Sequence, residues 1–195
     1  MEMLDSQFGH PSGFIGWLTG QAMALEHPEL AGWATSLLEL WPDDRVLEVG
    51  FGPGTAIQLM SQLAYRGFVA GVDLSAVMVR QASARNAAAI RQGRVELREG
   101  SATALPYGDA RFGKALAINS VDHWSSPAGG LKELWRVLQP GGLACIVDRP
   151  HGAKGEEAVA RAGEEMLGLV RSAGFAGVRT VAGLKGTAVG VLGTK

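Results

Sequence analysis

The chain of 195 residues is long enough for one α/β core but too short for that core and a second independent domain. Its formal net charge of −1 gives no general attraction to nucleic acid or to an anionic membrane, and a single cysteine, Cys145, excludes an intramolecular disulfide. The first residues lack the basic region of a secretory signal and no apolar run reaches membrane-spanning length, so we expect one cytoplasmic domain over residues 1–195.

Two sets of apolar residues recur at helical spacing before the first predicted strand. The first set is Ile15, Leu18, Ala22 and Leu25, and the second is Leu30, Trp33, Leu37 and Leu40. His27-Pro28 separates the two sets, because proline does not continue a helix. We therefore expect an annex of two amphipathic helices within residues 1–43, ahead of a core formed by residues 44–195.

From residue 44 onward, short apolar runs alternate with segments of helical spacing. The predicted strands are 45–49, 68–72, 95–98, 114–118 and 142–147, and the predicted helices are 56–65, 76–92, 128–138 and 156–173. Two further β-like runs, 178–184 and 187–192, meet at Lys185-Gly186 and predict a hairpin. Alternating strands and helices are typical of a parallel sheet covered on both faces, so the predicted fold class is α/β.

An apolar stripe marks the buried face of the predicted helix 128–138. The stripe consists of Leu131, Leu134, Trp135 and Leu138. Aromatic residues at such spacing belong to the core more often than to a ligand site, so we expect Trp135 to be buried.

Residues 46–54 read Val-Leu-Glu-Val-Gly-Phe-Gly-Pro-Gly and carry the clearest functional pattern in the chain. The acidic Glu48 ends an apolar run, and glycines follow at positions 50, 52 and 54 just before a predicted helix. Glycine lacks a Cβ atom, so such a turn can take positive φ values and let a ligand lie against the backbone. The pattern predicts a strand, a tight turn and a helix that form the floor of a cofactor site.

The glycine spacing does not match a dinucleotide site. Such a site needs Gly-x-Gly-x-x-Gly, which places a pyrophosphate on the helix N-terminus. Counting from Gly50 puts Thr55 at the last glycine position, and counting from Gly52 puts Ile57 there. The Glu48 carboxylate would also repel a diphosphate and attract a cation. The turn therefore favours a cationic ligand.

With these motifs the chain resembles the class I S-adenosylmethionine-dependent methyltransferases of the small-molecule type, including those similar to the ubiquinone and menaquinone C-methyltransferases (methyltransferase type 11). Their first motif is an acidic-x-Gly-x-Gly-x-Gly turn, and S-adenosylmethionine carries an ammonium and a sulfonium but no phosphate. The resemblance implies a Rossmann-like three-layer sandwich with a seven-stranded, mostly parallel sheet whose last strand is antiparallel. It also implies S-adenosyl-L-methionine as cofactor and S-adenosyl-L-homocysteine as product.

Further segments match this family in order and spacing between residues 45 and 149. Asp73 ends the second predicted strand, 73 − 54 = 19 residues past the last glycine of the turn, where the family binds ribose hydroxyls. Residues 95–107 resemble the third strand and the adenine-side loop. Small-molecule members often carry Asp where this chain has Ser101 and Gly113, but a serine hydroxyl can still accept a hydrogen bond from the adenine amine.

The resemblance implies that the cofactor binds at the carboxyl ends of the first four strands. The expected cofactor-binding residues are Glu48, Gly50, Phe51, Gly52, Gly54, Asp73, Leu74, Met78, Ser101, Ala102 and Asn119. An alternative is that the glycines only shape the turn and that Asp73 only caps the helix starting near residue 76. The four histidines show no metal-ligand spacing, so no metal site is expected.

The candidate catalytic residue is His123, in the segment Asp122-His123-Trp124 after the fourth predicted strand. Methyl transfer from a sulfonium is an in-line displacement with an activated leaving group, so positioning can supply much of the catalysis. A base is needed only when the accepting atom starts protonated, and an imidazole can take that proton. The alternative is that His123 is an exposed loop histidine without a catalytic role.

We expect a small organic acceptor, bound between the N-terminal helices and the loop 122–127, and no nucleic-acid or membrane partner. The chain has Asn119-Ser-Val-Asp122 where methyltransferases of DNA base amines carry Asn/Asp-Pro-Pro-aromatic, and its arginines between residues 80 and 98 lie among acidic residues, as on a solvated surface. The alternative function is S-adenosylmethionine binding without methyl transfer, as in a sensor, a scaffold or an enzyme of a non-methylating rearrangement.

Overall fold

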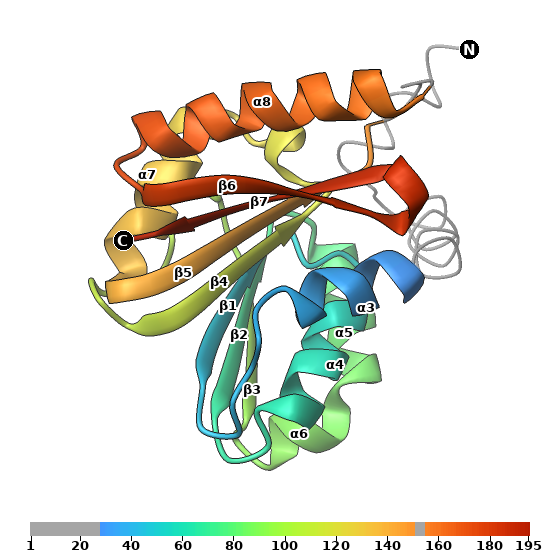
Figure 1. Ribbon diagram of the computed structural model, residues 1–195. Coiled ribbons are helices and arrows are strands. Elements are labelled where there is room, and N and C mark those ends of the chain that lie inside the picture. The colour runs from blue at the N-terminus through green and yellow to red at the C-terminus, as the bar shows by residue number, and fades with distance from the viewer. Residues whose placement is uncertain (1–27, 151–154) are drawn as a thin grey trace.

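A computed structural model describes residues 28–150 and 155–195 of the chain (Figure 1). Within these residues the centre is a seven-stranded sheet in the order β3-β2-β1-β4-β5-β7-β6. The strands are β1 (Arg45–Val49), β2 (Phe68–Asp73), β3 (Val95–Glu99), β4 (Phe112–Ile118), β5 (Leu138–Asp148), β6 (Ala176–Gly183) and β7 (Ala188–Thr194). The first five strands pair in parallel, whereas β7 is antiparallel to both of its neighbours, β5 and β6. The expected mostly parallel sheet with an antiparallel last strand is confirmed.

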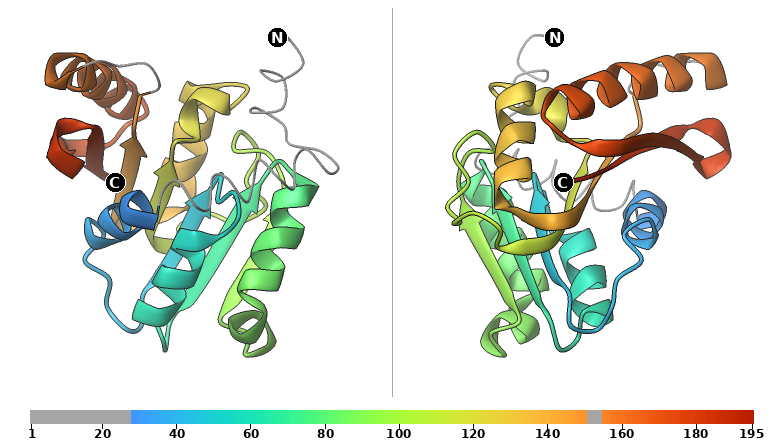
Figure 2. Two further views of the ribbon diagram at one scale, coloured as in Figure 1. Left: turned by 90° about the vertical axis from the view of Figure 1, so that its right-hand side faces the viewer. Right: turned by 60° about the vertical axis from the view of Figure 1, so that its left-hand side comes forward.

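Helices cover both faces of the sheet. The helices of the described residues are α3 (Pro28–Ser36), α4 (Thr55–Leu63), α5 (Ala76–Arg85), α6 (Ala87–Arg91), α7 (Pro127–Val137) and α8 (Glu156–Ser172). The helices α3 to α6 lie on one face, and α7 and α8 lie on the other (Figure 1, Figure 2). Val46 and Leu47 of β1 belong to opposite cores, because successive side chains of a strand point to opposite faces. The expected three-layer sandwich is confirmed.

The N-terminal annex is described only in part. Its first predicted helix, with apolar residues from Ile15 to Leu25, lies outside the described residues, and its second corresponds to α3. Leu30 of α3 is fully buried in the core of the first face, which confirms the predicted buried side of this helix. No helix among residues 28–150 and 155–195 combines the length and the apolar character needed to cross a membrane.

The predicted helix 76–92 is wrong in its continuity, because α5 and α6 meet at Asn86. The Asn86 side-chain amide Nδ2 donates to the carbonyl of Ala82 at 2.9 Å and to the carbonyl of Gly54 at 3.2 Å. An asparagine side chain that bonds to backbone carbonyls competes with the regular hydrogen bonds of a helix. The Asn86 side chain therefore ends α5 and also links this end to the turn that precedes α4.

The expectation that Trp135 is buried is also wrong, because this residue is 37% exposed. Leu131 and Leu134 of the same stripe are fully buried on α7, and Trp135 lies at the border of their face. Its indole Nε1 donates to the carbonyl of Gly174 at 3.2 Å, and the Lys195 ammonium lies 4.1 Å from the centre of the ring. The N–H edge and one face of the indole contact these two partners, so the ring does not enter the core.

The sheet reverses its strand order between β1 and β4. From β1 the chain proceeds outward through β2 and β3, and it later returns to the other side of β1 with β4 and β5. In open α/β sheets, ligands bind outside the carboxyl ends of the strands at such a point. The predicted site residues follow these ends, with residues 48–54 at β1, 73–74 at β2 and 119 at β4.

Phe51 lies shortly after β1, and its ring packs over β2. Gly71 in β2 leaves the room for this ring. A Cβ atom at position 71 would lie 2.6 Å from Phe51 Cδ1 and 2.8 Å from Leu97 Cδ2. Phe51 is only 4% exposed, so its ring cannot move outward without opening the core. The position of the turn after β1 therefore depends on a missing side chain in the neighbouring strand.

We expect the variant Gly71→Ala to lower the free energy of unfolding by about 1–3 kcal/mol, because the extra methyl group overpacks this contact. Gly32→Ala is the matched control, since a Cβ atom at this position in α3 meets no atom within 4 Å. Alanine is the better helix former by about 0.5–1 kcal/mol, so the control should gain stability. Urea unfolding of both variants measures the difference, and a fully stable Gly71→Ala protein would contradict the packing described.

Candidate functional site

The turn after β1 has three glycines with left-handed backbone, Gly50 (φ 77°), Gly52 (φ 50°) and Gly54 (φ 79°). A Cβ atom on Gly50 would lie 2.4 Å from Ser120 Cβ, and one on Gly54 would lie 2.6 Å from Ala82 Cβ. A Cβ atom on Gly52 would meet nothing within 4 Å. The outer two glycines are therefore needed for packing, whereas the middle one faces open space that a ligand can occupy.

The Asp73 carboxylate connects the turn to β2. Its Oδ2 accepts from the Gly52 amide at 2.8 Å, and its Oδ1 accepts from the Ser75 amide at 2.9 Å. Burial raises the pKa of Asp73, and these two amides oppose the rise. Ser75, not Asp73, caps α5, since the Ser75 hydroxyl accepts from the Met78 amide at 3.4 Å. Each Asp73 oxygen retains capacity to accept a further hydrogen bond from a ligand.

Glu48 is a buried carboxyl group beneath the same turn. It is 2% exposed, and its Oε2 atom has no hydrogen-bond partner. Burial raises the pKa of Glu48 well above its ordinary value, the nearby Asp73 raises it further, and the Ile57 amide partly opposes the shift. A buried carboxyl group with one oxygen left without a partner favours a site that receives a cation.

The adenine-side segment begins at the carboxyl end of β3. The Gly100 amide donates to the Asp73 carbonyl at 2.9 Å, which places Ser101 and Ala102 beside the end of β2. The Ser101 hydroxyl accepts from the Thr103 amide at 3.2 Å and shares a hydrogen bond of 2.9 Å with the Thr103 hydroxyl. If that shared proton is donated by Ser101, one of its lone pairs remains for a ligand amine.

Two expected cofactor residues have buried side chains and a third is exposed. Phe51 is 4% exposed and Met78 is 3% exposed, and both belong to the core that contains α4 and α5. Leu74 is 52% exposed directly after β2, where it offers an apolar surface to a ligand. Any contact of Phe51 with a cofactor would therefore come from its backbone.

Asn119 joins the carboxyl ends of β4 and β5. It has a left-handed backbone with φ 47°, its amide donates to the Val147 carbonyl at 2.9 Å, and its Oδ1 accepts from the Arg149 amide at 2.8 Å. The next residue, Ser120, is buried and donates to the Val49 carbonyl at 2.9 Å. Ser120 is not among the expected site residues, because its contact with the end of β1 joins residues 71 positions apart and leaves no local signal.

His123 lies in the 3-10 turn η1 (Val121–His123), and its side chain is exposed. Val121 is buried beneath this turn, and the ring of Trp124 fills a notch over Gly130 of α7, where a Cβ atom would lie 2.2 Å from Trp124 Cε3. The turn is therefore anchored on both sides of His123. Within the described residues, no three His, Cys, Asp or Glu side chains gather closely enough to hold a metal ion.

These residues together fit a ligand that is cationic at one end and apolar at the other. Glu48 provides a buried carboxyl oxygen without a partner, Gly52 provides open backbone, and Asp73 provides acceptors between them. Leu74 and Ser101 provide an apolar surface and a hydroxyl group farther along the sheet edge. S-adenosylmethionine, with its ammonium, sulfonium, ribose and adenine, has this order of groups.

We expect Glu48→Gln to remove much of the pH dependence of stability between mildly acidic and neutral pH. A carboxyl group with a raised pKa in the folded state binds its proton more tightly when folded, so stability is highest below its ordinary value of 4.5 and falls as the pH rises toward the raised pKa. Glutamine is neutral at every pH and keeps an acceptor for the Ile57 amide. The free energy of unfolding is measured with urea at about pH 5 and at about pH 8. If this free energy changed by the same amount between the two pH values in wild type and variant, the expectation would be contradicted.

The chain matches a protein family over its central part. Residues 47–146, just over half of the chain, match the family described as "Methyltransferase domain". The matched region runs from β1 into β5 and contains all of the expected site residues.

Relatives carry the same activity in their names. Methyltransferase YdaC of Bacillus subtilis is 31% identical over 81% of this chain and 86% of its own length. Erythromycin 3''-O-methyltransferase of Saccharopolyspora erythraea is 34% identical over 68% of this chain and 44% of its own length. The ubiquinone/menaquinone biosynthesis C-methyltransferase UbiE of Geotalea daltonii is 26% identical over 60% of this chain and 50% of its own length. This chain spans about half the length of the last two enzymes.

A solved structure shares the fold. A SAM dependent methyltransferase from Aquifex aeolicus matches with a TM-score of 0.65 and 21% identity, over 86% of this chain and 88% of that one. The family match and the names of the relatives favour methyl transfer over binding without turnover. The chain belongs to the methyltransferase-domain family and is a class I S-adenosylmethionine-dependent methyltransferase, with S-adenosyl-L-methionine as cofactor and S-adenosyl-L-homocysteine as product.

Proposed function

We propose that this methyltransferase acts on a small organic acceptor and that the residues at the carboxyl ends of β1, β2 and β3 hold its cofactor. The observation that carries this proposal is the open turn at Gly52, flanked by the carboxyl groups of Glu48 and Asp73. The acceptor class is supported by relatives named as an erythromycin O-methyltransferase and a ubiquinone/menaquinone C-methyltransferase.

The proposed parts follow from the charge and exposure of each residue. Glu48 attracts the positive groups of the cofactor, because it is a buried carboxyl group whose Oε2 atom has no hydrogen-bond partner. Asp73 accepts from the ribose hydroxyls while it holds the Gly52 amide. Leu74 lies against the adenine, and the Ser101 hydroxyl accepts from the adenine amine. The remaining expected residues shape the walls of the site and support these four.

The proposed chemistry relies mainly on position. S-adenosylmethionine supplies a methyl group on a positively charged sulfur, and a neutral thioether leaves when the acceptor atom forms its bond to that carbon. The protein holds the acceptor atom in line and limits the access of water. The anchored turn η1 presents His123, which takes the acceptor proton when the attacking atom starts protonated.

The experiment that tests the proposed acceptor class uses purified protein with methyl-labelled S-adenosylmethionine. Three separate pools are offered: small metabolites, nucleic acid and protein, each from the same cell extract. We expect label in the small-metabolite pool and formation of S-adenosylhomocysteine in the same reaction. Label confined to the nucleic-acid or protein pool would refute a small organic acceptor.

We expect Asp73→Asn to weaken S-adenosylhomocysteine binding more than Ser101→Ala does. A hydrogen bond to a charged group contributes about 1.5–3 kcal/mol and a neutral one about 1 kcal/mol. Asparagine also keeps only one acceptor oxygen for the two amides of Gly52 and Ser75, which the carboxylate accepts from. Calorimetry gives both dissociation constants, and thermal unfolding shows whether each variant is folded. Equal losses in two folded variants would remove Asp73 from the ribose role.

If the acceptor must be deprotonated, we expect His123→Ala to lower turnover by about 10²–10⁴-fold with nearly unchanged cofactor affinity. The exposed position of the imidazole means that its loss should not disturb the core. Asp122→Asn is the matched control, because its side chain is also exposed on η1. Wild-type turnover of His123→Ala on the true acceptor would exclude His123 as a base and leave positioning as the explanation.

A further inference from the structure

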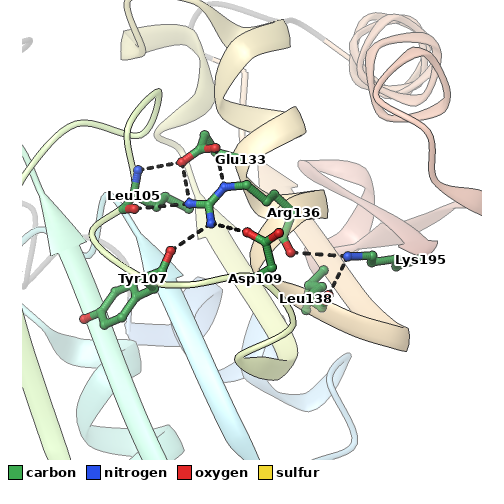
Figure 3. A network of polar contacts seen from close by, with 7 residues as sticks. All are labelled: Leu105, Tyr107, Asp109, Glu133, Arg136, Leu138 and Lys195. Atoms are coloured by element: carbon green, nitrogen blue, oxygen red, sulfur yellow. Dashed lines mark hydrogen bonds and ion pairs between the residues drawn. The ribbon is translucent and has the colours of Figure 1, made fainter.

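Two side chains of α7 hold the segment 100–111 that connects β3 to β4 (Figure 3). This segment has no helix or strand, and Ser101 and Ala102 of the proposed adenine site follow its first residue, Gly100. Its middle is fixed by Leu105, which is 5% exposed and packs into the core beneath α7. The backbone around Leu105 receives its polar contacts from Glu133 and Arg136 (Figure 3).

Arg136 uses every donor of its guanidinium group in this contact. Its Nε donates to Glu133 Oε1 at 2.6 Å. Its Nη2 donates to Glu133 Oε2 at 2.8 Å and to the Leu105 carbonyl at 3.2 Å. Its Nη1 donates to the Tyr107 carbonyl and to Asp109 Oδ1, at 2.8 Å each. A guanidinium has five N–H donors in a fixed plane, so the five contacts define its orientation completely. Lysine has three donors on one atom and cannot reproduce this arrangement.

Glu133 completes the contact from the other side. Its Oε2 accepts from the Leu105 amide at 2.8 Å, so the pair holds both the amide and the carbonyl of the same residue. The side chains of Arg136 and Glu133 are only 30% and 19% exposed, which limits the screening of their attraction by water. Arg136 lowers the pKa of Glu133, and the Leu105 amide lowers it further, so the carboxylate stays charged at neutral pH.

The same helix also anchors the loop that carries His123. At the start of α7 the Ser126 hydroxyl accepts from the Gly129 amide at 3.1 Å, and Trp124 packs over Gly130 one turn into the helix. The helix is rigid over this distance, because it is continuous from Pro127 to Val137 and buries one face. The segment with Ser101 and the loop with His123 are therefore both attached to one rigid element.

We propose that Arg136, oriented by Glu133, is a positioning residue that sets where the Ser101 hydroxyl meets the adenine amine of the cofactor. The proposal rests on the cofactor placement proposed above. Arg136 acts through the segment 100–111, because its contacts reach Leu105, Tyr107 and Asp109 and not Ser101 itself. At the other end of the segment the Gly100 amide donates to the Asp73 carbonyl, and between the two attachments the Ala104 amide donates to the Ser101 carbonyl at 3.2 Å. The position of Leu105 is therefore passed on to Ser101 through the neighbouring Ala104.

The test compares two ligands that differ at the adenine amine, S-adenosylhomocysteine and S-inosylhomocysteine, in which oxygen replaces that amine. Wild-type protein should prefer S-adenosylhomocysteine, because only this ligand carries the amine that donates to the Ser101 hydroxyl. We expect Arg136→Lys to weaken S-adenosylhomocysteine about tenfold, or ~1.4 kcal/mol, and to leave S-inosylhomocysteine nearly unchanged. The preference between the two ligands should therefore fall, and Glu133→Gln should shift it in the same direction.

Lys195→Met is the matched control. The Lys195 ammonium donates to the Arg136 carbonyl at 3.2 Å and to the Leu138 carbonyl at 2.8 Å, at the same end of α7 but without contact to the segment (Figure 3). This variant should lose stability and keep the wild-type preference.

Every other result of the binding comparison would contradict one specific part of the proposal. Equal affinity losses for both ligands in Arg136→Lys would show that the pair only stabilises the fold, and an unchanged preference would show the same. If Arg136→Lys does not fold, Glu133→Gln decides between these results. A wild-type protein that binds S-adenosylhomocysteine without preference over S-inosylhomocysteine would overturn the positioning proposal, whereas one that does not bind S-adenosylhomocysteine would overturn the proposed site itself.

Discussion

The close approach of the backbone after β1 to its neighbours is the constraint on which the rest of the site depends. Ser120 and Ala82 come so near to Gly50 and Gly54 that neither glycine has space for a Cβ atom. This contact fixes the start of α4 against both β4 and α5, and it directs the Gly52 amide toward Asp73. The turn is thus held by three neighbouring elements, and the open face of Gly52 is the part that they leave uncovered.

The site contains a buried carboxyl group that the folded chain satisfies only in part. Glu48 is buried with an oxygen that has no partner, and the nearby Asp73 makes its ionisation still less favourable. Burying such a group without a partner lowers the stability of the free protein. A cationic ligand that supplies the partner therefore binds more tightly, because the carboxyl group is already desolvated before the ligand arrives. Binding sites of this kind exchange some stability of the free protein for affinity.

The two loops that flank the proposed cofactor and acceptor positions are connected through α7. One end of the helix carries the packing of Trp124 over Gly130, and the other end carries the contacts of Glu133 and Arg136 with the segment 100–111. A class I methyltransferase needs its cofactor and acceptor in line, and a distance error of about 1 Å is costly for such a reaction. Because both loops are attached to one rigid helix, the distance between them stays constant.

The α/β class, the order of the strands along the chain and the location of the turn could be predicted from the sequence, because they follow from local periodicity and from glycines next to an acidic residue. Three findings needed the three-dimensional structure: Asn86 breaks a predicted helix, Trp135 stays partly exposed, and Ser120 and Arg136 contact the end of β1 and the segment 100–111. The contacts of Asn86 with Gly54, of Arg136 with Leu105 and of Ser120 with Val49 join residues that are 32, 31 and 71 positions apart. A local pattern fixes how a segment repeats, but which distant groups meet depends on how the whole sheet and its helices pack together.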